Sequence, residues 1–345
     1  MTKREAAILA GLIVVLAAVF LLSLALGSTA VPLGRVMMAL AGRSPERDAA
    51  TIIVETIRLP RSLTAILAGA SLGVAGLQMQ TLFRNPLADP FALGVTSGAS
   101  LGVALVVLGS GYGPAAVGDA LGVRGDALVI AAAIAGAAAV LGLVLMVSVR
   151  IQNPTTVLIL GLMFGYAVSA VVTVLVGASQ PERLPQWVQW GLGSFSGVTW
   201  QRLRLFGPVS LAGVLIAAST TKQLNALLLG ENYARSMGVA VKGVRVLTML
   251  GASILGAVVT AFCGPISFLG IAVPHLCRGL LGTSDHRVLV PAVVMMGGVL
   301  ALLAQIVSLS PGSAGVLPLN AVTSLMGAPV VAVVLLRSRR GALAG

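Results

Sequence analysis

The chain has 345 residues, of which 57% are hydrophobic and only 9% are charged, and its mean hydropathy is +1.03. A soluble domain carries roughly 25% charged residues, so this composition excludes a globular protein with a water-facing surface. The formal net charge of +12 does not indicate nucleic-acid binding, because the arginines stand at the ends of apolar runs and form no basic stripe.

Apolar runs of about 20 residues, the length that crosses a hydrocarbon core about 30 Å thick, recur along the chain. We therefore predict an all-α polytopic membrane protein in which residues 1–345 form a single transmembrane domain. The 42 glycines suit such a bundle, because small residues let helix backbones approach closely in a bilayer. The ten predicted transmembrane helices cover residues 6–27, 61–83, 91–110, 127–149, 155–177, 203–222, 244–263, 266–281, 288–308 and 318–337.

The distribution of basic residues predicts the orientation. The first apolar run lacks a small-residue cleavage site, so we expect a retained first helix. With the N-terminus inside, the inner segments carry 13 basic and four acidic residues, and the outer segments carry nine basic and six acidic residues. The excess of Lys and Arg on the inner side predicts that both termini are cytoplasmic.

Two arginines, Arg58 and Arg61, flank a Leu-Pro pair where the second predicted helix begins on the outer side. Arginines at helix ends commonly extend toward the lipid headgroups. The rigid donor fork of arginine also suits the carboxylates of a soluble partner. The residues alone leave both interpretations open.

The second predicted helix ends in Gln78 and Gln80, followed by the turn sequence RNPLADP. Amides in a span either bond to neighbouring helices or face a transport pathway, and both interpretations stand. The two prolines and the asparagine of the turn favour a tight reversal of the chain. The turn residues of interest are Arg84, Asn85, Pro86, Asp89 and Pro90.

The inner segment 223–245, QLNALLLGENYARSMGVAVKGVR, is too long and too amphipathic for an ordinary connection. Its leucines at 224, 227 and 228 can share one face of a short helix, and Gly230 and Gly238 permit sharp turns. Elsewhere, LTAILAGASLGVAG within residues 61–80 is similar to LTMLGASILGAVVT within residues 245–264. The two segments run in opposite directions, so the likeness fits either inverted repeats or a shared Gly and Ala composition.

The run from residue 58 to residue 102, including RNPLADP, closely resembles the membrane permeases of ABC importers for iron–siderophore, haem and cobalamin uptake (the FecCD/BtuC type). Residues 264–287, GPISFLGIAVPHLCRGLLGTSDHR, and residues 317–329, LPLNAVTSLMGAP, resemble two further signatures of these permeases. Asn320 stands where that family usually has glycine. The resemblance implies the cobalamin-permease-like fold of type II ABC importers.

The resemblance also implies an assembly and roles for these segments. Similar permeases form homodimers, carry ATP-binding cassette ATPase subunits on the cytoplasmic side and receive a periplasmic or lipid-anchored substrate-binding protein outside. Arg58 and Arg61 match an arginine pair that docks acidic residues of the binding protein. GENYARSMG resembles coupling helices that sit in a cleft of the ATPase, and RNPLADP is a signature turn. The implied coupling residues are Leu228, Gly230, Glu231, Ala234, Arg235 and Gly238.

The absence of several sequence motifs reduces the number of functions that the chain could have. No GxxxxGK[ST] sequence is present, so we expect ATP hydrolysis on a separate subunit and no enzyme activity in this chain. We expect no catalytic residue, cofactor or metal site, and the only histidines, His275 and His286, are expected to hold helix ends together. No acidic residue falls within the predicted spans, which weakens the alternative of an ion-coupled secondary transporter of a bulky apolar solute. We expect a permease in the bacterial inner membrane for a metal chelate, with a ferric siderophore favoured over cobalamin or haem.

Overall fold

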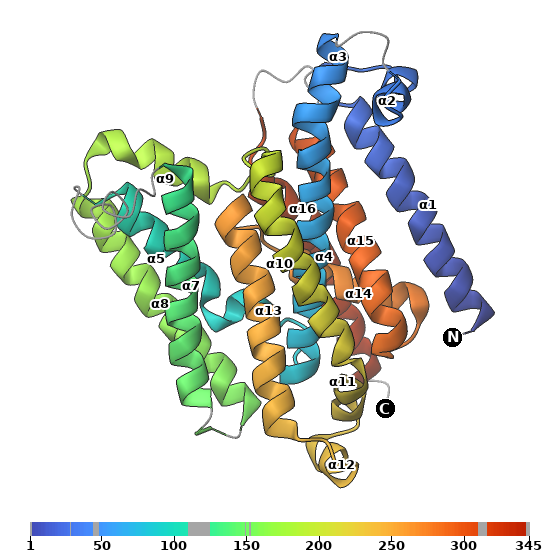
Figure 1. The fold of residues 1–345 in the computed structure, drawn as a ribbon. Coiled ribbons are helices and arrows are strands. Elements are labelled where there is room, and N and C mark those ends of the chain that lie inside the picture. Colours follow the sequence, from blue (N-terminus) through green and yellow to red (C-terminus); the bar gives the residue numbers. More distant parts are fainter. Residues whose placement is uncertain are drawn as a thin grey trace.

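The computed structural model describes residues 2–27, 29–43, 48–109, 125–148, 150–151, 153–309 and 316–342, and within them the chain forms helices and no strand. The long helices run side by side as a bundle (Figure 1). Both termini lie in the half of the molecule that carries α11 (Thr221–Leu228) and α12 (Glu231–Ser236).

Ten apolar helices make up the bundle in the described residues. Seven are long and apolar enough to cross a membrane, and the other three have shorter apolar stretches. These ten helices correspond to the ten predicted from the sequence, so the prediction of an all-α polytopic membrane protein is confirmed. The seven are α1 (Lys3–Ala25), α4 (Leu59–Phe83), α7 (Asp126–Ser148), α8 (Pro154–Ala178), α10 (Trp200–Ser219), α13 (Val241–Cys263) and α15 (His286–Ser308). The other three are α5 (Val95–Val107), α14 (Leu269–Leu281) and α16 (Leu319–Ala342), whose apolar stretch is Leu319–Val333.

Several short helices were not predicted, because they are too short to give a spanning signal. Helix α10 begins and ends three residues before the predicted helix 203–222, and the predicted helix 91–110 is interrupted at Gly94, whose φ is +75°. The short elements are α2 (Leu33–Leu40), α3 (Ala49–Ile52), the π-helix η1 (Ile53–Arg58), η2 (Pro90–Leu93), η3 (Pro181–Arg183) and α9 (Leu184–Gly191).

Helix α4 forms the centre of the bundle. It packs against α1, α10, α13, α14 and α15, and 83% of its most apolar stretch is buried, compared with 17% for α1. A Cβ added to Gly69 would lie 2.0 Å from the carbonyl oxygen of Gly297 on α15, and one added to Gly76 would lie 1.7 Å from that of Gly270 on α14. The helix backbones therefore touch at these glycines, as expected where no hydrophobic force drives helices together in lipid.

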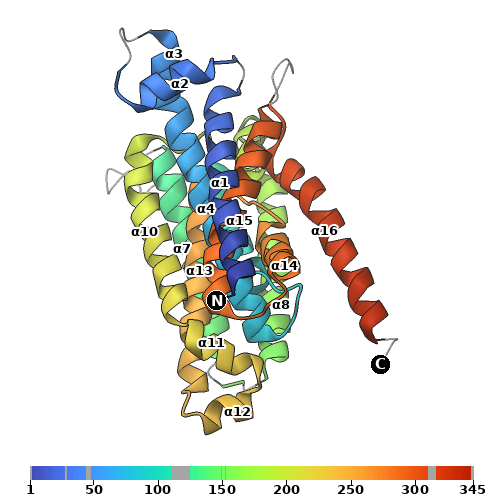
Figure 2. The same cartoon turned by 90° about the vertical axis from the view of Figure 1, so that its right-hand side faces the viewer.

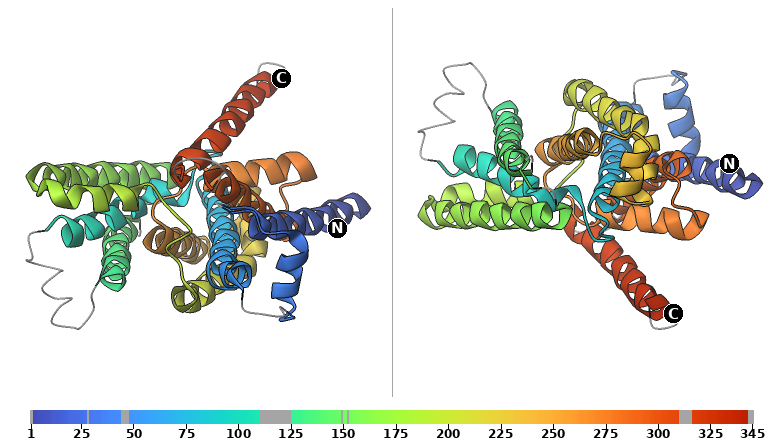
Figure 3. Two further views of the ribbon diagram at one scale, coloured as in Figure 1. Left: turned by 90° about the horizontal axis from the view of Figure 1, so that it is seen from above. Right: turned by 90° about the horizontal axis from the view of Figure 1, so that it is seen from below.

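The helices at the periphery of the bundle are less enclosed by neighbours than α4 is. Helix α16 leans away from the other helices toward its C-terminal end (Figure 2), and the views along the bundle show α1 and α16 projecting in different directions from the centre (Figure 3). Helices α4 and α13 are in contact and run in opposite directions. This arrangement is compatible with inverted repeats, which stay a prediction.

Candidate functional site: the two ends of the bundle

Arg58 lies at the end of η1 and is only 5% exposed. Its Nη1 donates hydrogen bonds to the carbonyl oxygens of Leu24 (2.7 Å) and Ala25 (2.8 Å) in the last turn of α1. Its Nη2 donates to the carbonyl oxygen of Thr29. The last carbonyls of a helix have no partner within it, so Arg58 satisfies the C-terminal end of α1 from the neighbouring helix.

Arg61 has a different environment from Arg58. It is partly exposed, and its Nε has no hydrogen-bond partner among the described residues. It lines a cavity of about 160 Å³ together with Gln189 and Gln305 at the end of the bundle opposite α12. Of the two predicted docking arginines, Arg61 is therefore the one whose side chain faces an accessible recess.

Gln78 and Gln80 are buried where α4 meets its neighbours, with exposed fractions of 2% and 4%. Nε2 of Gln80 donates to the carbonyl oxygen of Ile271 at 3.3 Å, and its Oε1 accepts from Nη1 of Arg278 at 2.5 Å. Nε2 of Gln78 lies 3.5 Å from Oγ1 of Thr220. These contacts favour hydrogen bonding between helices, and the pathway interpretation stays a prediction.

The signature turn is fixed on two sides. Arg84 ends α4 in the left-handed region, with φ of 47°, and its Nη2 donates to the carbonyl oxygen of Leu227 on α11 at 3.2 Å. Nε2 of His275 on α14 donates to the carbonyl oxygen of Pro86 at 2.7 Å. Within the turn, Oδ1 of Asn85 accepts from the backbone N–H of Leu87 at 2.9 Å, as an asparagine does in a tight turn.

The second half of the turn folds back into the bundle. Oδ1 of Asp89 accepts from the N–H of Ala92 at 2.9 Å and caps η2. Pro90 packs against α13 at Gly256, where an added Cβ would lie 3.1 Å from the proline ring. Burial raises the pKa of Asp89 to about 6, against the lowering effect of its backbone hydrogen bonds. This carboxylate is thus closer to neutrality than an exposed one.

The predicted coupling segment forms α11 and α12, which project beyond the bundle at one end (Figure 1). Gly230 and Gly238 have φ of +120° and +81°, so they supply the two turns that the sequence indicated. The inner side of this segment is a small apolar core that includes the predicted residue Ala234 and is separate from the main one. Its members are Leu224, Ala226, Leu227, Ala234 and Val241.

Four large apolar side chains of the coupling segment are exposed on the side that faces away from the bundle. We call these four side chains the α12 tip. They are Leu228 (43% exposed), Leu229 (66%), Tyr233 (53%) and Met237 (59%). Only Leu228 among them was named from the sequence. The other three lie inside residues 223–245, but a linear motif does not reveal which side of such short helices faces outward.

The charged residues of the coupling segment are paired. Oε1 of Glu231 accepts from Nη2 of the buried Arg245 at 2.6 Å, and its Oε2 lies 3.3 Å from Nη2 of Arg235. Glu231 therefore joins α12 to the first turns of α13, and Arg235 keeps half of its side chain exposed. Two of the predicted coupling residues thus serve first to hold α12 in position.

A polar network joins the coupling segment to the bundle, and sequence reasoning did not find it. Oδ1 of Asn225 on α11 accepts from Nδ1 of His286 at 2.7 Å, and Nε2 of His286 accepts from the hydroxyl of Thr81 on α4 at 2.9 Å. Nδ2 of Asn225 donates to Asp285 at 2.6 Å. The ends of α4, α11 and α15 are therefore connected through one buried histidine, a role for His286 that agrees with the expectation that it holds helix ends together.

The described residues contain no group of three or more His, Cys, Asp or Glu side chains that could hold a metal ion. Cys263 and Cys277 are both buried as free thiols. The features described above lie at the two ends of an apolar bundle, beside Arg61 at one end and on α11 and α12 at the other.

The sequence model of the FecCD transport family matches residues 15–337 of the chain. The chain belongs to the FecCD transport family. This FecCD protein is 37% identical over 339 residues to the vitamin B12 import system permease protein BtuC of Klebsiella pneumoniae, covering 98% of this chain and 96% of that protein. It is 34% identical over 291 residues to the ABC transporter permease protein YvrB of Bacillus subtilis, covering 84% and 80% of the two chains.

A solved structure supports the same assignment. The FecCD protein matches an inward-facing conformation of a putative metal-chelate type ABC transporter with a TM-score of 0.82 at 30% identity, over 96% of this chain and 99% of the other. The FecCD protein is therefore a polytopic membrane permease of the ABC importer type. The resemblance stated from RNPLADP and the two later signatures is confirmed.

Proposed function

We propose that this FecCD permease is the membrane subunit of an ATP-driven importer of a metal chelate in a bacterial inner membrane, with both termini cytoplasmic. The proposed chelate is a ferric siderophore, with cobalamin or haem as the alternatives to test beside it. A relative in K. pneumoniae imports vitamin B12 and a structural relative is of the metal-chelate type, which supports the wider class. Uptake of the three labelled chelates by the reconstituted complex distinguishes among them.

The observation that carries the proposal is the α12 tip. Four exposed apolar side chains stand on short helices that are braced from behind by the Asn225–His286–Thr81 network. An exposed apolar patch on braced helices is what a docking surface for another protein requires. We assign the ATP-binding cassette ATPase to this surface.

The test is co-purification with candidate ATP-binding cassette ATPases from the same organism, co-expressed with this chain. Met237→Asp and Tyr233→Asp should abolish co-purification, because a carboxylate would be desolvated in the interface. Leu33→Asp on α2 is the matched control, since Leu33 is a similarly exposed (53%) apolar residue at the opposite end. Equal loss in the control would refute the assignment.

At the opposite end, we propose that the periplasmic or lipid-anchored binding protein docks over the recess beside Arg61. Arg58 contributes by fixing the end of α1 beneath that surface. This division differs from the sequence prediction that both arginines make the contact, and it is supported by the burial of Arg58.

We also propose that the permease works as a homodimer. Helix α8 exposes Ile159, Met163, Tyr166 and Val174 along its length, with Val174 70% exposed, and α16 leans outward from the bundle (Figure 2). A second copy would cover these faces. Cross-linking of single cysteines placed on α8 should give a dimer, and lipid exposure of α8 would predict monomers only.

The competing function is ion-coupled secondary transport. In the described residues, the acids of the candidate spans are Glu5, Glu55 and Asp126, all at or near span ends. Carriers driven by protons or sodium place such groups within the membrane. If the purified chain alone moved a chelate under an ion gradient, the secondary-transport alternative would replace our proposal.

A further inference from the structure

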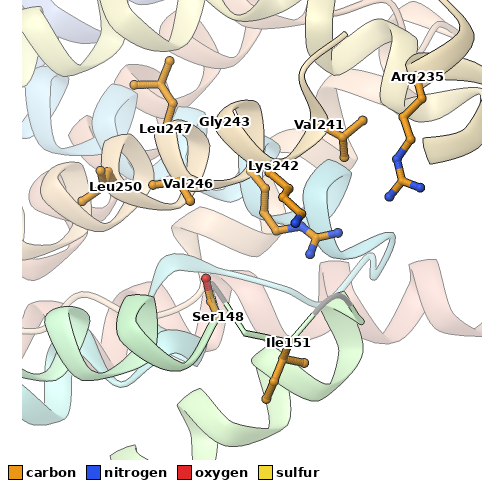
Figure 4. A pocket seen from close by; sticks show the side chains of 10 residues that line it. Ser148, Ile151, Arg235, Val241, Lys242, Gly243, Val246, Leu247 and Leu250 are labelled. Carbon is orange, nitrogen blue, oxygen red and sulfur yellow. The ribbon is translucent and has the colours of Figure 1, made fainter.

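A cavity of about 480 Å³ lies where the first turns of α13 face the connection between α7 and α8 (Figure 4). It opens beside the α12 tip and is not part of it. The residues that matter here are Ser148, Ile151, Arg235, Lys242, Leu247 and Leu250.

The residues that line the cavity are basic at one end and apolar at the other. Lys242 stands in the first turn of α13, and the apolar residues Val246, Leu247 and Leu250 follow along the same helix. Leu250 is eight residues beyond Lys242, which is about 12 Å further into the bundle. Figure 4 shows these three apolar side chains toward one end of the cavity and Arg235 toward the other. The cavity is thus cationic near the end of the helix and apolar within the span.

The charges around the cavity do not cancel. Arg235, Lys242 and Arg245 line it, and Glu231 is the acid that pairs with both arginines. Lys242 is exposed, and 52% of the side chain of Arg235 is exposed. Both can therefore reach an anionic group at the mouth of the cavity.

We propose that this cavity binds one anionic phospholipid, with its phosphate at Lys242 and Arg235 and an acyl chain along Val246, Leu247 and Leu250. Basic pockets between membrane helices on the cytoplasmic side bind anionic headgroups. A soluble partner docked at the α12 tip cannot supply the apolar contact, because Leu247, 44% exposed, faces outward from a spanning helix. Arg235 belongs to α12, so a bound lipid would also connect the coupling segment to the α7–α8 end.

The first test measures lipid retention by the full-length chain in detergent. Dioleoyl phosphatidylglycerol and dioleoyl phosphatidylcholine are titrated, and bound lipid is counted by mass spectrometry of the intact protein. The wild type should retain phosphatidylglycerol preferentially, and Lys242→Gln should weaken that retention about fivefold. Lys222→Gln removes the same charge from exposed α11 outside the cavity and should change nothing. Absence of a preference in the wild type, or equal weakening by Lys222→Gln, overturns the proposal.

The second test fills the cavity without changing any charge. A Cβ at Gly243 meets no atom within 4 Å, so Gly243→Phe can place its ring in the cavity and should abolish specific retention. Gly279→Phe, at an equally open position on α14, is the control and should retain the lipid. Unchanged retention in Gly243→Phe overturns the proposal. Displacement of the lipid by glycerol phosphate at equal concentration also overturns it, because it would mean that the anion alone is bound.

Discussion

Nη2 of Arg84 and the carbonyl oxygen of Leu227 form a hydrogen bond of 3.2 Å that joins the signature turn to α11. On its other side, the same turn is held by the 2.7 Å hydrogen bond between His275 and Pro86. The turn therefore stands between the coupling segment and α14. A displacement of α11 must either move the turn or break the bond to Arg84.

The first prediction concerns Arg84. Arg84→Ala should leave ATPase binding intact and lower transport per ATP hydrolysed, because the link between α11 and the turn is lost. The cost in stability should be about 1 kcal/mol, as for one partly exposed hydrogen bond. Arg287→Ala, at an exposed arginine on the same face, should change neither quantity. Unchanged transport per ATP in Arg84→Ala would show that the link is structural only.

The second prediction concerns the pH dependence of Asp89. The pKa of its carboxyl is about 6 in the folded protein and 3.8 ordinarily, so the folded state binds the proton more tightly. Proton binding by Asp89 therefore stabilises the folded state most below pH 4, and this stabilisation is lost as the pH rises through 6. Between pH 7 and pH 5 the wild type should therefore gain about 1 kcal/mol relative to Asp89→Asn, which keeps an acceptor for Ala92.

Thermal unfolding of both Asp89 forms in detergent, at several pH values, measures this difference. All other titrating groups are the same in the two proteins. The pH dependence of their difference in stability therefore reports on the Asp89 carboxyl alone. A difference that does not vary with pH would mean that Asp89 is fully charged in the fold throughout this range.

The third prediction separates the two outer arginines. Arg58→Ala should destabilise the fold by about 3 kcal/mol, because it removes the hydrogen bonds of a buried charged side chain to the carbonyl oxygens of Leu24 and Ala25. Arg61→Glu should leave stability nearly unchanged and weaken binding-protein affinity, with the loss reduced at high salt. Affinity measured on folded, purified permease at low and high salt tests both statements. Equal affinities of the Arg61 variant and the wild type would remove Arg61 from the docking surface.

The fourth prediction concerns helix packing at the centre. Gly69→Ala would bring a methyl group 2.0 Å from the carbonyl oxygen of Gly297, and a backbone carbonyl cannot rotate away. The helices must separate, so we expect a loss of about 3 kcal/mol or more and little folded protein. Gly11→Ala on α1 is the control, since a Cβ there meets no atom within 4 Å. Similar yields of both variants would contradict the close approach of α4 and α15.

The sequence predicted the positions of the ten apolar helices well, because length and hydropathy are local properties. It also predicted the two turns of residues 223–245, because the positions of glycines are local. The prediction that three leucines share one helix face was wrong, since Leu224 and Leu227 are buried and Leu228 is 43% exposed. The partners of Arg58 could not be found this way, because Thr29 and the end of α1 are brought to it only by tertiary packing. Likewise, Asn225 and His286 are 61 residues apart, and no motif connects them.

The sequence of the signature turn also did not show that its second half packs inside the bundle. RNPLADP reads as a surface reversal because its residues are polar or turn-forming. The structure instead packs Pro90 against Gly256, and this contact depends on a glycine more than 160 residues away in the chain. The raised pKa of Asp89 follows from that return and was therefore not predictable.

The enclosure of α4 has a consequence for biosynthesis. Its buried polar side chains include Ser62, Gln78 and Gln80, yet α15, against which it packs, ends only at Ser308. A ribosome adding about 5–20 residues per second needs roughly 10–45 s to make the intervening chain. During that interval α4 lies in the bilayer without α15. Its polar side chains must then be kept from lipid by earlier helices or by the insertion machinery. Among the candidate spans of the described residues, the most buried one is thus synthesised well before the helix against which it packs.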